Sequence, residues 1–235
     1  TPTFSNGVTL SGGNITVPAG VTSFTVTVPT TNDTIDESDE TIDITVGGVA
    51  ATGTIEDNDS APTISSVSTE SETEGTDLVH TVTLSNESAV ATTFSFTLAG
   101  NTAAGTDFTS TPTFSNGVTL SGGNITVPAG VTSFTVTVPT TNDTIDESDE
   151  TIDITVGGVA ATGTIEDNDS APTISSVSTE SETEGTDLVH TVTLSNESAV
   201  ATTFSFTLAG NTAAGTDFTS TPTFSNGVTL SGGNI

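Results

Sequence analysis

The stretch "SFTVTVPTTNDTIDESDETIDITV", residues 133–156, contains two alternating apolar segments separated by a strongly acidic one. The alternating apolar residues are Phe134, Val136 and Val138 in the first segment and Ile152, Ile154 and Val156 in the second. Apolar side chains that recur at every second position lie on one face of a β-strand. The stretch therefore predicts two half-buried strands joined by an acidic loop.

The same period-two pattern recurs through residues 61–170, and no stretch shows a convincing helical period. The clearest segments are "LVHTVTLS" (78–85), "TTFSFTL" (92–98), "VTSFTVTV" (131–138) and "TIDITV" (151–156). Turn sequences such as "SNG" (115–117) and "SGGN" (121–124) separate the strands. Short alternating strands at this density predict an all-β fold, an antiparallel immunoglobulin-like β-sandwich. His80 and His190 share an apolar strand face, which predicts a structural, partly buried role for both.

The chain is a tandem repeat, because residues 1–110 recur unchanged as 111–220 and residues 221–235 begin the same text again. This period is too long for a solenoid unit of about 20–50 residues and is typical of a whole domain. Because the chain does not begin with methionine, we expect it to be part of a longer array of identical neighbouring repeats.

The connector "GTIEDNDSAPTISSVS" (53–68) ends one strand and opens another, which predicts domain boundaries near Ser60 and Ser170. The predicted units are the C-terminal part of a repeat (1–60), one complete β-sandwich repeat (61–170) and the N-terminal part of the next (171–235).

The chain is exceptionally acidic: it has 30 Asp and Glu, no Lys or Arg, 2 His and no Cys, giving a formal net charge of −30. Nucleic acid and anionic membranes are not expected partners, since phosphate binding needs basic groups. No apolar run approaches the roughly 18 residues of a membrane span, so direct membrane insertion is not expected. Without cysteine or lysine, neither a disulfide nor an isopeptide bond can cross-link the fold, and a metal ion is the remaining candidate.

The acidic residues cluster at strand ends and turns, where alternate loops of a sandwich can converge. The main clusters are residues 72–77, 105–108, 142–150 and 167–169. Calcium takes six to eight oxygen ligands, whereas zinc and copper favour the His and Cys that are scarce or absent here. The alternative is a solvated acidic surface that confers solubility. Repulsion of about 1–4 kcal/mol per close carboxylate pair, with no basic group to offset it, favours metal binding.

Neither acidic segment is an EF-hand loop, because Asp57-Asn58-Asp59 lacks the glycine and glutamate of that motif. The succession "EG", "AGTDF", "ITVPAG", "NDTIDESDETIDITV" and "GTIEDND" instead resembles the Calx-β domain over almost all of residues 61–170. This resemblance implies a Calx-β-like sandwich that binds several calcium ions at one end. The ligands it implies are Glu74, Asp107, Asp143, Glu147, Glu150, Asp167, Asn168 and Asp169. Asn142 and Asn168 stand where the family often has acids, a departure that would lower the ion count or weaken one site.

Identical cysteine-free repeats of this kind resemble the extender region of large bacterial surface adhesins of the RTX type. The resemblance implies an extracellular spacer at the bacterial cell surface, made rigid by calcium and serving adhesion and biofilm formation. The alternative is a calcium-dependent glycan- or surface-binding module, since identical repeats also suit multivalent weak binding. An enzyme is not expected, because there is no nucleophile–base arrangement and no Trp or Tyr to form a sugar platform.

The two outer parts of the chain have complementary halves of the predicted calcium site. The ligand positions in residues 1–60 are Asp33, Glu37, Glu40, Asp57, Asn58 and Asp59, and those in residues 171–235 are Glu184 and Asp217. Each part would leave apolar strand faces and sheet edges exposed. We therefore expect head-to-tail strand complementation, in which the C-terminal part of one chain joins the N-terminal part of another and shares calcium with it.

Overall fold

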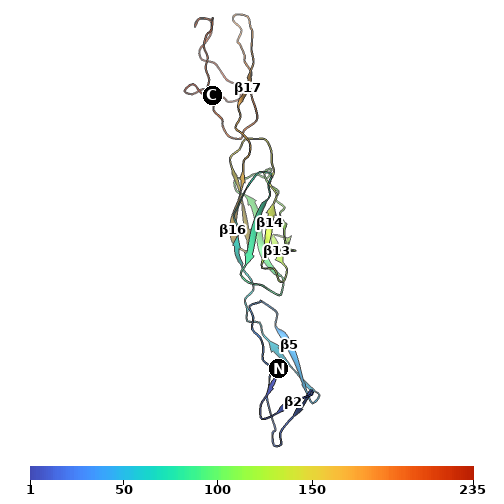
Figure 1. Cartoon of the computed structure of the whole chain (residues 1–235). Coiled ribbons are helices and arrows are strands. Elements are labelled where there is room, and N and C mark those ends of the chain that lie inside the picture. The colour runs from blue at the N-terminus through green and yellow to red at the C-terminus, as the bar shows by residue number, and fades with distance from the viewer.

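The computed structural model describes residues 1–235 and contains β-strands without helices, so the all-β prediction is confirmed. Figure 1 shows an elongated rod in which the N-terminal part, a central sandwich and the C-terminal part follow one another. No helix is present that could span a membrane. The chain enters the central sandwich at the end nearer the N-terminal part and leaves it at the end nearer the C-terminal part.

Two sheets form the central sandwich (Figure 1). The four-stranded sheet has the order β11 (Thr113–Phe114), β14 (Ser133–Val138), β9 (Leu78–Leu84) and β7 (Ile64–Val67). The six-stranded sheet has the order β12 (Thr119–Ser121), β13 (Asn124–Val127), β10 (Thr92–Gly100), β15 (Glu150–Val156), β16 (Val159–Glu166) and β8 (Glu70–Thr73). The alternating segments predicted from the sequence are therefore β9, β10, β14 and β15.

The core lies between these sheets and consists of the alternating residues that the sequence indicates. Fully buried side chains from both sheets include Leu78, Val82, Phe134, Val136, Val138, Ile152, Ile154 and Val156. His80 is fully buried among them, and its Nδ1 lies 2.7 Å from the Ser68 carbonyl oxygen, which agrees with a structural role. His190 is exposed, so the prediction of partial burial is wrong for it, although its Nδ1 still lies 2.8 Å from the Ser178 carbonyl oxygen.

One strand pair departs from the antiparallel pattern, because β8 runs parallel to β16, with Gly163 opposite Glu70 and Glu166 opposite Thr73. Gly163 also brings the two sheets into close contact. A Cβ there would lie 2.8 Å from Leu78 Cδ1 and 3.0 Å from His80 Nε2, so only glycine leaves room for both side chains.

The outer parts form only small pieces of the same architecture. The N-terminal part contains β1 (Thr3–Phe4) paired with β4 (Val26–Thr27), β2 (Thr9–Ser11) with β3 (Asn14–Thr16), and β5 (Glu40–Val46) with β6 (Val49–Ile55). The C-terminal part contains β17 (Ile174–Val177) paired with β18 (Val192–Leu194). Residues 23–28 have the sequence of β14, yet only two of them are in a strand, because the neighbouring β9 has no counterpart here.

Candidate metal centre

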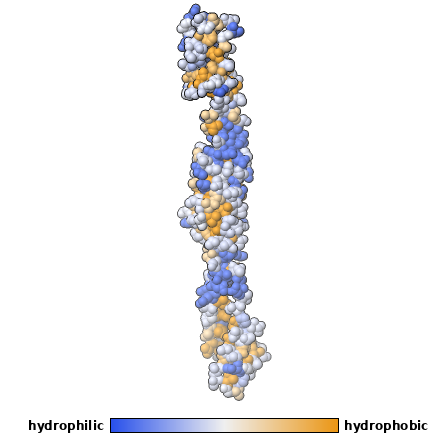
Figure 2. All heavy atoms as spheres, turned by 90° about the vertical axis from the view of Figure 1, so that its left-hand side faces the viewer, coloured by the Kyte–Doolittle hydropathy of each residue, from blue (hydrophilic) through white to orange (hydrophobic).

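Two groups of three carboxylates lie at the end of the central sandwich that faces the next repeat. The first consists of Glu74, Asp143 and Asp169, and the second of Asp107, Glu147 and Glu150. Within each group, one carboxylate oxygen per residue lies within 4.8 Å of the others. Figure 2 shows hydrophilic bands across the rod where one repeat meets the next, and the acidic end of the sandwich lies at one of them.

Four chain segments bring these side chains together. Glu74 directly follows β8, Asp107 lies in the loop after β10, the β14–β15 loop and the start of β15 supply Asp143, Glu147 and Glu150, and Asp169 follows β16. Because β8 is parallel to β16, both strands end at the same edge, and the Glu74 amide donates a 3.0 Å hydrogen bond to the Glu166 carbonyl oxygen.

A glycine allows the acidic loop to approach Glu74 closely. Gly75 has a φ of +79°, and a Cβ at this position would lie 2.8 Å from Asn142 Cβ. The left-handed conformation and the missing side chain are both available to glycine at little cost. Asn142 Oδ1 accepts a 2.8 Å hydrogen bond from Asn168 Nδ2, which ties the loop to the segment after β16.

Backbone hydrogen bonds orient the remaining carboxylates. Asp107 Oδ2 accepts from the Ala104 amide at 2.5 Å, and its own carbonyl accepts from the Thr141 amide at 2.8 Å. Asp143 Oδ1 accepts from the Ile145 amide at 2.7 Å and forms a local Asx turn. Each of these residues keeps a second carboxylate oxygen or lone pairs for a cation.

Three carboxylate oxygens at this end are buried without a hydrogen-bond partner: Glu74 Oε1, Asp167 Oδ1 and Asp169 Oδ2. Glu74 is only 8% exposed. An unpaired buried carboxylate is unfavourable because it loses hydration without compensation. A bound cation is the partner that would compensate all three, since the chain has no Lys or Arg to do so.

The same crowding raises the pKa of three glutamates. Burial raises the pKa of Glu150 to about 7, and the neighbouring Asp107 and Glu147 carboxylates contribute to this shift. Burial likewise raises the pKa of Glu147, and the charges of Asp107, Asp143 and Asp167 add to the effect. Burial also raises the pKa of Glu74, with further contributions from Asp169, Asp143 and Asp167. The ionised carboxylates are therefore destabilised unless a positive charge lies close to them.

The second group surrounds a small hollow of about 10 Å³, room for roughly one water-sized sphere. Its carboxylate lining consists of Glu74, Asp107, Glu147, Glu150 and Asp167. The donors are oxygen atoms only, without nitrogen or sulfur ligands, and such donor sets suit calcium better than zinc or copper. The residues present therefore fit a calcium ion.

The structure places the predicted ligands of residues 61–170 as follows. Six lie in the two carboxylate groups, and Asp167 lines the hollow that the second group surrounds. Asn168 directs its amide nitrogen to Asn142 Oδ1 and, at 3.4 Å, to the Glu74 carbonyl oxygen. Its side chain thus connects the acidic loop, through Asn142, with the segment that contains Glu74.

The predicted ligands of the outer parts remain apart within one chain. Burial raises the pKa of Glu37, and the charges of the nearby Asp33, Glu40, Asp57 and Asp59 add to the effect. No group of three converging carboxylates forms there, and Asn58 Nδ2 donates to Asn32 Oδ1 at 2.7 Å. Glu184 and Asp217 are exposed in the C-terminal part. Each outer part thus has an incomplete version of the central cluster.

Sequence reasoning missed the contact between successive repeats. Asp146, in the middle of the acidic loop, is 8% exposed and accepts a hydrogen bond from Ser198 Oγ of the next repeat. The Ala199 amide donates to the Asp146 carbonyl oxygen at 2.9 Å. The same contacts join Asp36 to Ser88 and Ala89 one repeat earlier. No local pattern could reveal these partners, which lie 52 residues apart.

Fold and site together define an antiparallel β-sandwich repeat with a carboxylate-lined candidate cation centre at the end that meets the next repeat. Among solved structures, the chain is similar to the crystal structure of the calcium binding domain CBD12 of CALX1.1, with 21% identity and a TM-score of 0.35. The match covers 49% of this chain and 50% of that one. CBD12 from CALX1.2 matches with the same identity and TM-score, over 49% of this chain and 48% of that one. The chain thus spans about half the length of the structures it matches. No family model and no curated protein matches it.

Proposed function

We propose that this chain is part of a spacer of tandem β-sandwiches in a bacterial cell-surface adhesin, stiffened by calcium at the acidic end of each repeat. In this role the repeats lie outside the cell and hold a ligand-binding region away from the surface. Their function is mechanical and non-catalytic.

One observation carries the proposal: a single loop bears both the candidate calcium ligands and the contact to the next repeat. Asp143, Glu147 and Glu150 point into the carboxylate groups, while Asp146 accepts the hydrogen bond from Ser198. Ions held by Asp143 in the first group and by Glu147 and Glu150 in the second would fix the loop and, with it, the joint. Metal binding and inter-repeat stiffness are therefore linked through residues 143–150.

Electrostatics explains why calcium matters for stability. Without an ion, close carboxylates repel by about 1–4 kcal/mol per pair, depending on the effective dielectric constant. With an ion, the four segments that carry the ligands are cross-linked at their ends. Because the ion binds the folded state only, it stabilises the fold by mass action.

The connectors between repeats support the spacer role. Asn86 Nδ2 donates to the Ser60 carbonyl oxygen at 2.9 Å, and Asn196 does the same to Ser170. Pro62, just beyond the first of these contacts, is buried and restricts the backbone. Both junctions are built alike, so each added repeat extends the rod of Figure 1 by the same step.

A calcium titration followed by calorimetry and small-angle scattering tests the proposal. We expect millimolar calcium to raise the melting temperature and to yield the scattering profile of a stiff rod. Magnesium should substitute poorly, because it prefers a smaller octahedral site and keeps its waters. Identical melting in chelator and calcium would exclude the calcium centre. A flexible-string profile at saturating calcium would exclude the spacer role, and specific binding of the repeats to glycans would favour a recognition module instead.

A further inference from the structure

The acidic loop between β14 and β15 is tied to the segment after β16 at two points that involve no cation. At the start of the loop, Asn168 Nδ2 donates a 2.8 Å hydrogen bond to Asn142 Oδ1, a contact that we call the asparagine clasp. Near the end of the loop, Asp149 Oδ1 accepts a 3.2 Å hydrogen bond from the Asp167 amide. In both bonds a donor faces an acceptor, so this side of the loop can close without a bound ion.

The surrounding acceptors fix the orientation of both clasp amides. Asn168 Nδ2 also donates to the Glu74 carbonyl oxygen at 3.4 Å, and Asn142 Nδ2 donates to the Asp143 carbonyl oxygen at 2.8 Å. A side-chain amide has two donor hydrogens and one acceptor oxygen. Turning the Asn168 amide round would set its oxygen against two acceptor oxygens. The clasp therefore has one favourable arrangement, with Asn168 as donor and Asn142 as acceptor.

The same two ties form in the N-terminal part of the chain, although no group of three carboxylates converges in residues 1–60. Asn58 Nδ2 donates to Asn32 Oδ1 at 2.7 Å, and Asp39 Oδ1 accepts from the Asp57 amide at 3.0 Å. The ties thus do not depend on the carboxylate groups that would hold an ion.

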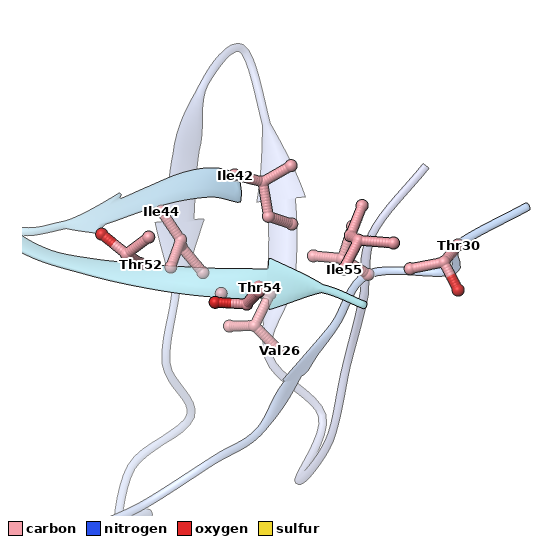
Figure 3. A pocket seen from close by; sticks show the side chains of 9 residues that line it. Val26, Thr30, Ile42, Ile44, Thr52, Thr54 and Ile55 are labelled. Atoms are coloured by element: carbon pink, nitrogen blue, oxygen red, sulfur yellow. The ribbon is translucent and has the colours of Figure 1, made fainter. Parts of the chain in front are cut away.

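The ties do not depend on a packed core either. Figure 3 shows the β5–β6 hairpin of the N-terminal part, whose apolar side lines an open groove of about 300 Å³. Thr30 and Ile55 line this groove and shortly precede Asn32 and Asn58 in the chain. The clasp forms beside this open groove with nearly the same length as in the central sandwich. It is therefore a local property of the loop and of the segment that follows the last strand.

The contact between repeats accompanies the clasp in both copies. Asp146, within the acidic loop, accepts a hydrogen bond from Ser198 of the next repeat. Asp36 accepts the same bond from Ser88, in the part of the chain that has the clasp but no group of three carboxylates. The joint thus occurs wherever the loop is clasped, with or without the carboxylate groups.

We propose that Asn142 and Asn168 are positioning residues that keep the acidic loop closed on the segment after β16 when no calcium is bound. This role deepens the proposed function and rests on it in one respect: calcium, once bound, adds ties to Glu74 and Asp107 on the sides that the clasp does not reach. Because the loop is closed beforehand, ion binding orders fewer residues. The joint carried by this loop therefore stays formed in calcium-poor surroundings.

The two asparagines have unequal roles, which provides a matched pair of variants. Asn142→Asp keeps an oxygen where Asn168 donates, and a carboxylate accepts such a bond at least as well as an amide does. Asn168→Asp removes the donor and sets a carboxylate against two acceptors, Asn142 Oδ1 and the Glu74 carbonyl oxygen. Turning the Asn142 amide round to compensate would set its oxygen against the Asp143 carbonyl oxygen. Each variant adds one negative charge at nearly the same place.

The experiment is amide hydrogen exchange of the 235-residue chain in chelator, read residue by residue by nuclear magnetic resonance. Two amides report directly: that of Asp167 donates to Asp149 across the closed loop, and that of Asp146 donates to the Glu197 carbonyl oxygen across the joint. We expect both to be protected in the unaltered chain and in Asn142→Asp. Asn168→Asp should speed their exchange on the order of fivefold or more, which corresponds to about 1 kcal/mol for one net hydrogen bond.

Two controls separate the clasp from charge and from unfolding. Asn168→Ala removes the donor without adding a charge and should speed exchange of the same two amides. The amides of β9 and β14 should exchange as in the unaltered chain, because their pairing lies inside the sandwich. Rapid exchange of the Asp146 and Asp167 amides in the unaltered chain would overturn the proposal. Equal acceleration in Asn142→Asp and Asn168→Asp would do so too, as would unchanged exchange in Asn168→Ala.

Addition of calcium distinguishes the clasp from the calcium centre. In Asn168→Asp, an ion can compensate the oxygens that face one another, so millimolar calcium should restore slow exchange of the Asp146 and Asp167 amides. The variant would thus make closure of the loop dependent on calcium, whereas closure in the unaltered chain is not. If the results in chelator are as expected and calcium restores nothing, the clasp is supported and the calcium centre of the proposed function is not.

Discussion

Ser198 donates a hydrogen bond to Asp146 of the preceding repeat, and Ser88 makes the same bond to Asp36 one repeat earlier. Ser88 is 4% exposed, so at this joint the serine hydroxyl is enclosed by the contact. The joint is small, polar and placed on the loop that also carries the candidate calcium ligands.

Removing both serine hydroxyls should loosen the rod without unfolding it. For Ser88→Ala combined with Ser198→Ala, we expect a broader distribution of end-to-end distances in small-angle scattering at saturating calcium. The melting temperature should hardly change, because the bonds join repeats and not the two sheets of one repeat. The control is Ser11→Ala with Ser121→Ala in the exposed β2 and β12 hairpins. Equal scattering from both pairs would mean that the serine contacts do not hold the joint.

Glu150→Gln should change the stability of the domain in opposite directions with and without calcium. In chelator it removes a repelling charge and should raise the melting temperature. In calcium it removes a ligand and should weaken affinity by about tenfold or more, as measured by calorimetric titration. Asp153→Asn on the solvent side of β15 removes the same charge away from both groups and should leave calcium affinity unchanged. Equal loss of affinity in both variants would show that only net charge matters.

The chain without calcium should become less stable as the pH rises from about 5 to about 8. Burial and neighbouring charges raise the pKa of Glu150 in the folded state from 4.5 to about 7. The folded carboxyl therefore binds its proton more tightly than the unfolded one, so its stabilising effect is complete below 4.5 and is lost as the pH rises through 7. Glu150→Gln should flatten this trend in thermal melts. If the pH dependence of stability is the same in this variant, the trend comes from the overall charge of the chain and not from Glu150.

Alternation of apolar residues was sufficient to predict β9, β10, β14 and β15 and the side chains that they bury. It did not predict the short β8, whose partner β16 is distant in sequence and parallel to it. The convergence of Glu74 with Asp169 depends on that pairing, and the ligand assignment in the sequence rested on family resemblance instead. Long-range pairing is set by packing of the whole domain, so a local pattern does not reveal it.

The repeats show directly how far a local sequence determines structure. Residues 23–28 and 133–138 are identical, yet one forms a two-residue strand and the other a six-residue strand. The difference lies in the neighbours, since β14 pairs with β9 over its whole length. Strand propensity thus expresses the fit to a surrounding sheet more than a property of the segment itself.

The parallel pairing of β8 with β16 determines how a repeat responds to tension. The chain enters the sandwich at β7, which leads directly into β8, and leaves it just after β16, at the opposite end of the sandwich (Figure 1). A pull on the two ends therefore slides these strands along each other, and the hydrogen bonds from Gly163–Glu70 to Glu166–Thr73 are loaded together in shear. They cannot open one at a time, as the bonds of a hairpin pulled apart from its ends would. We therefore expect the small polar joint between repeats to yield first under load, while each sandwich stays folded.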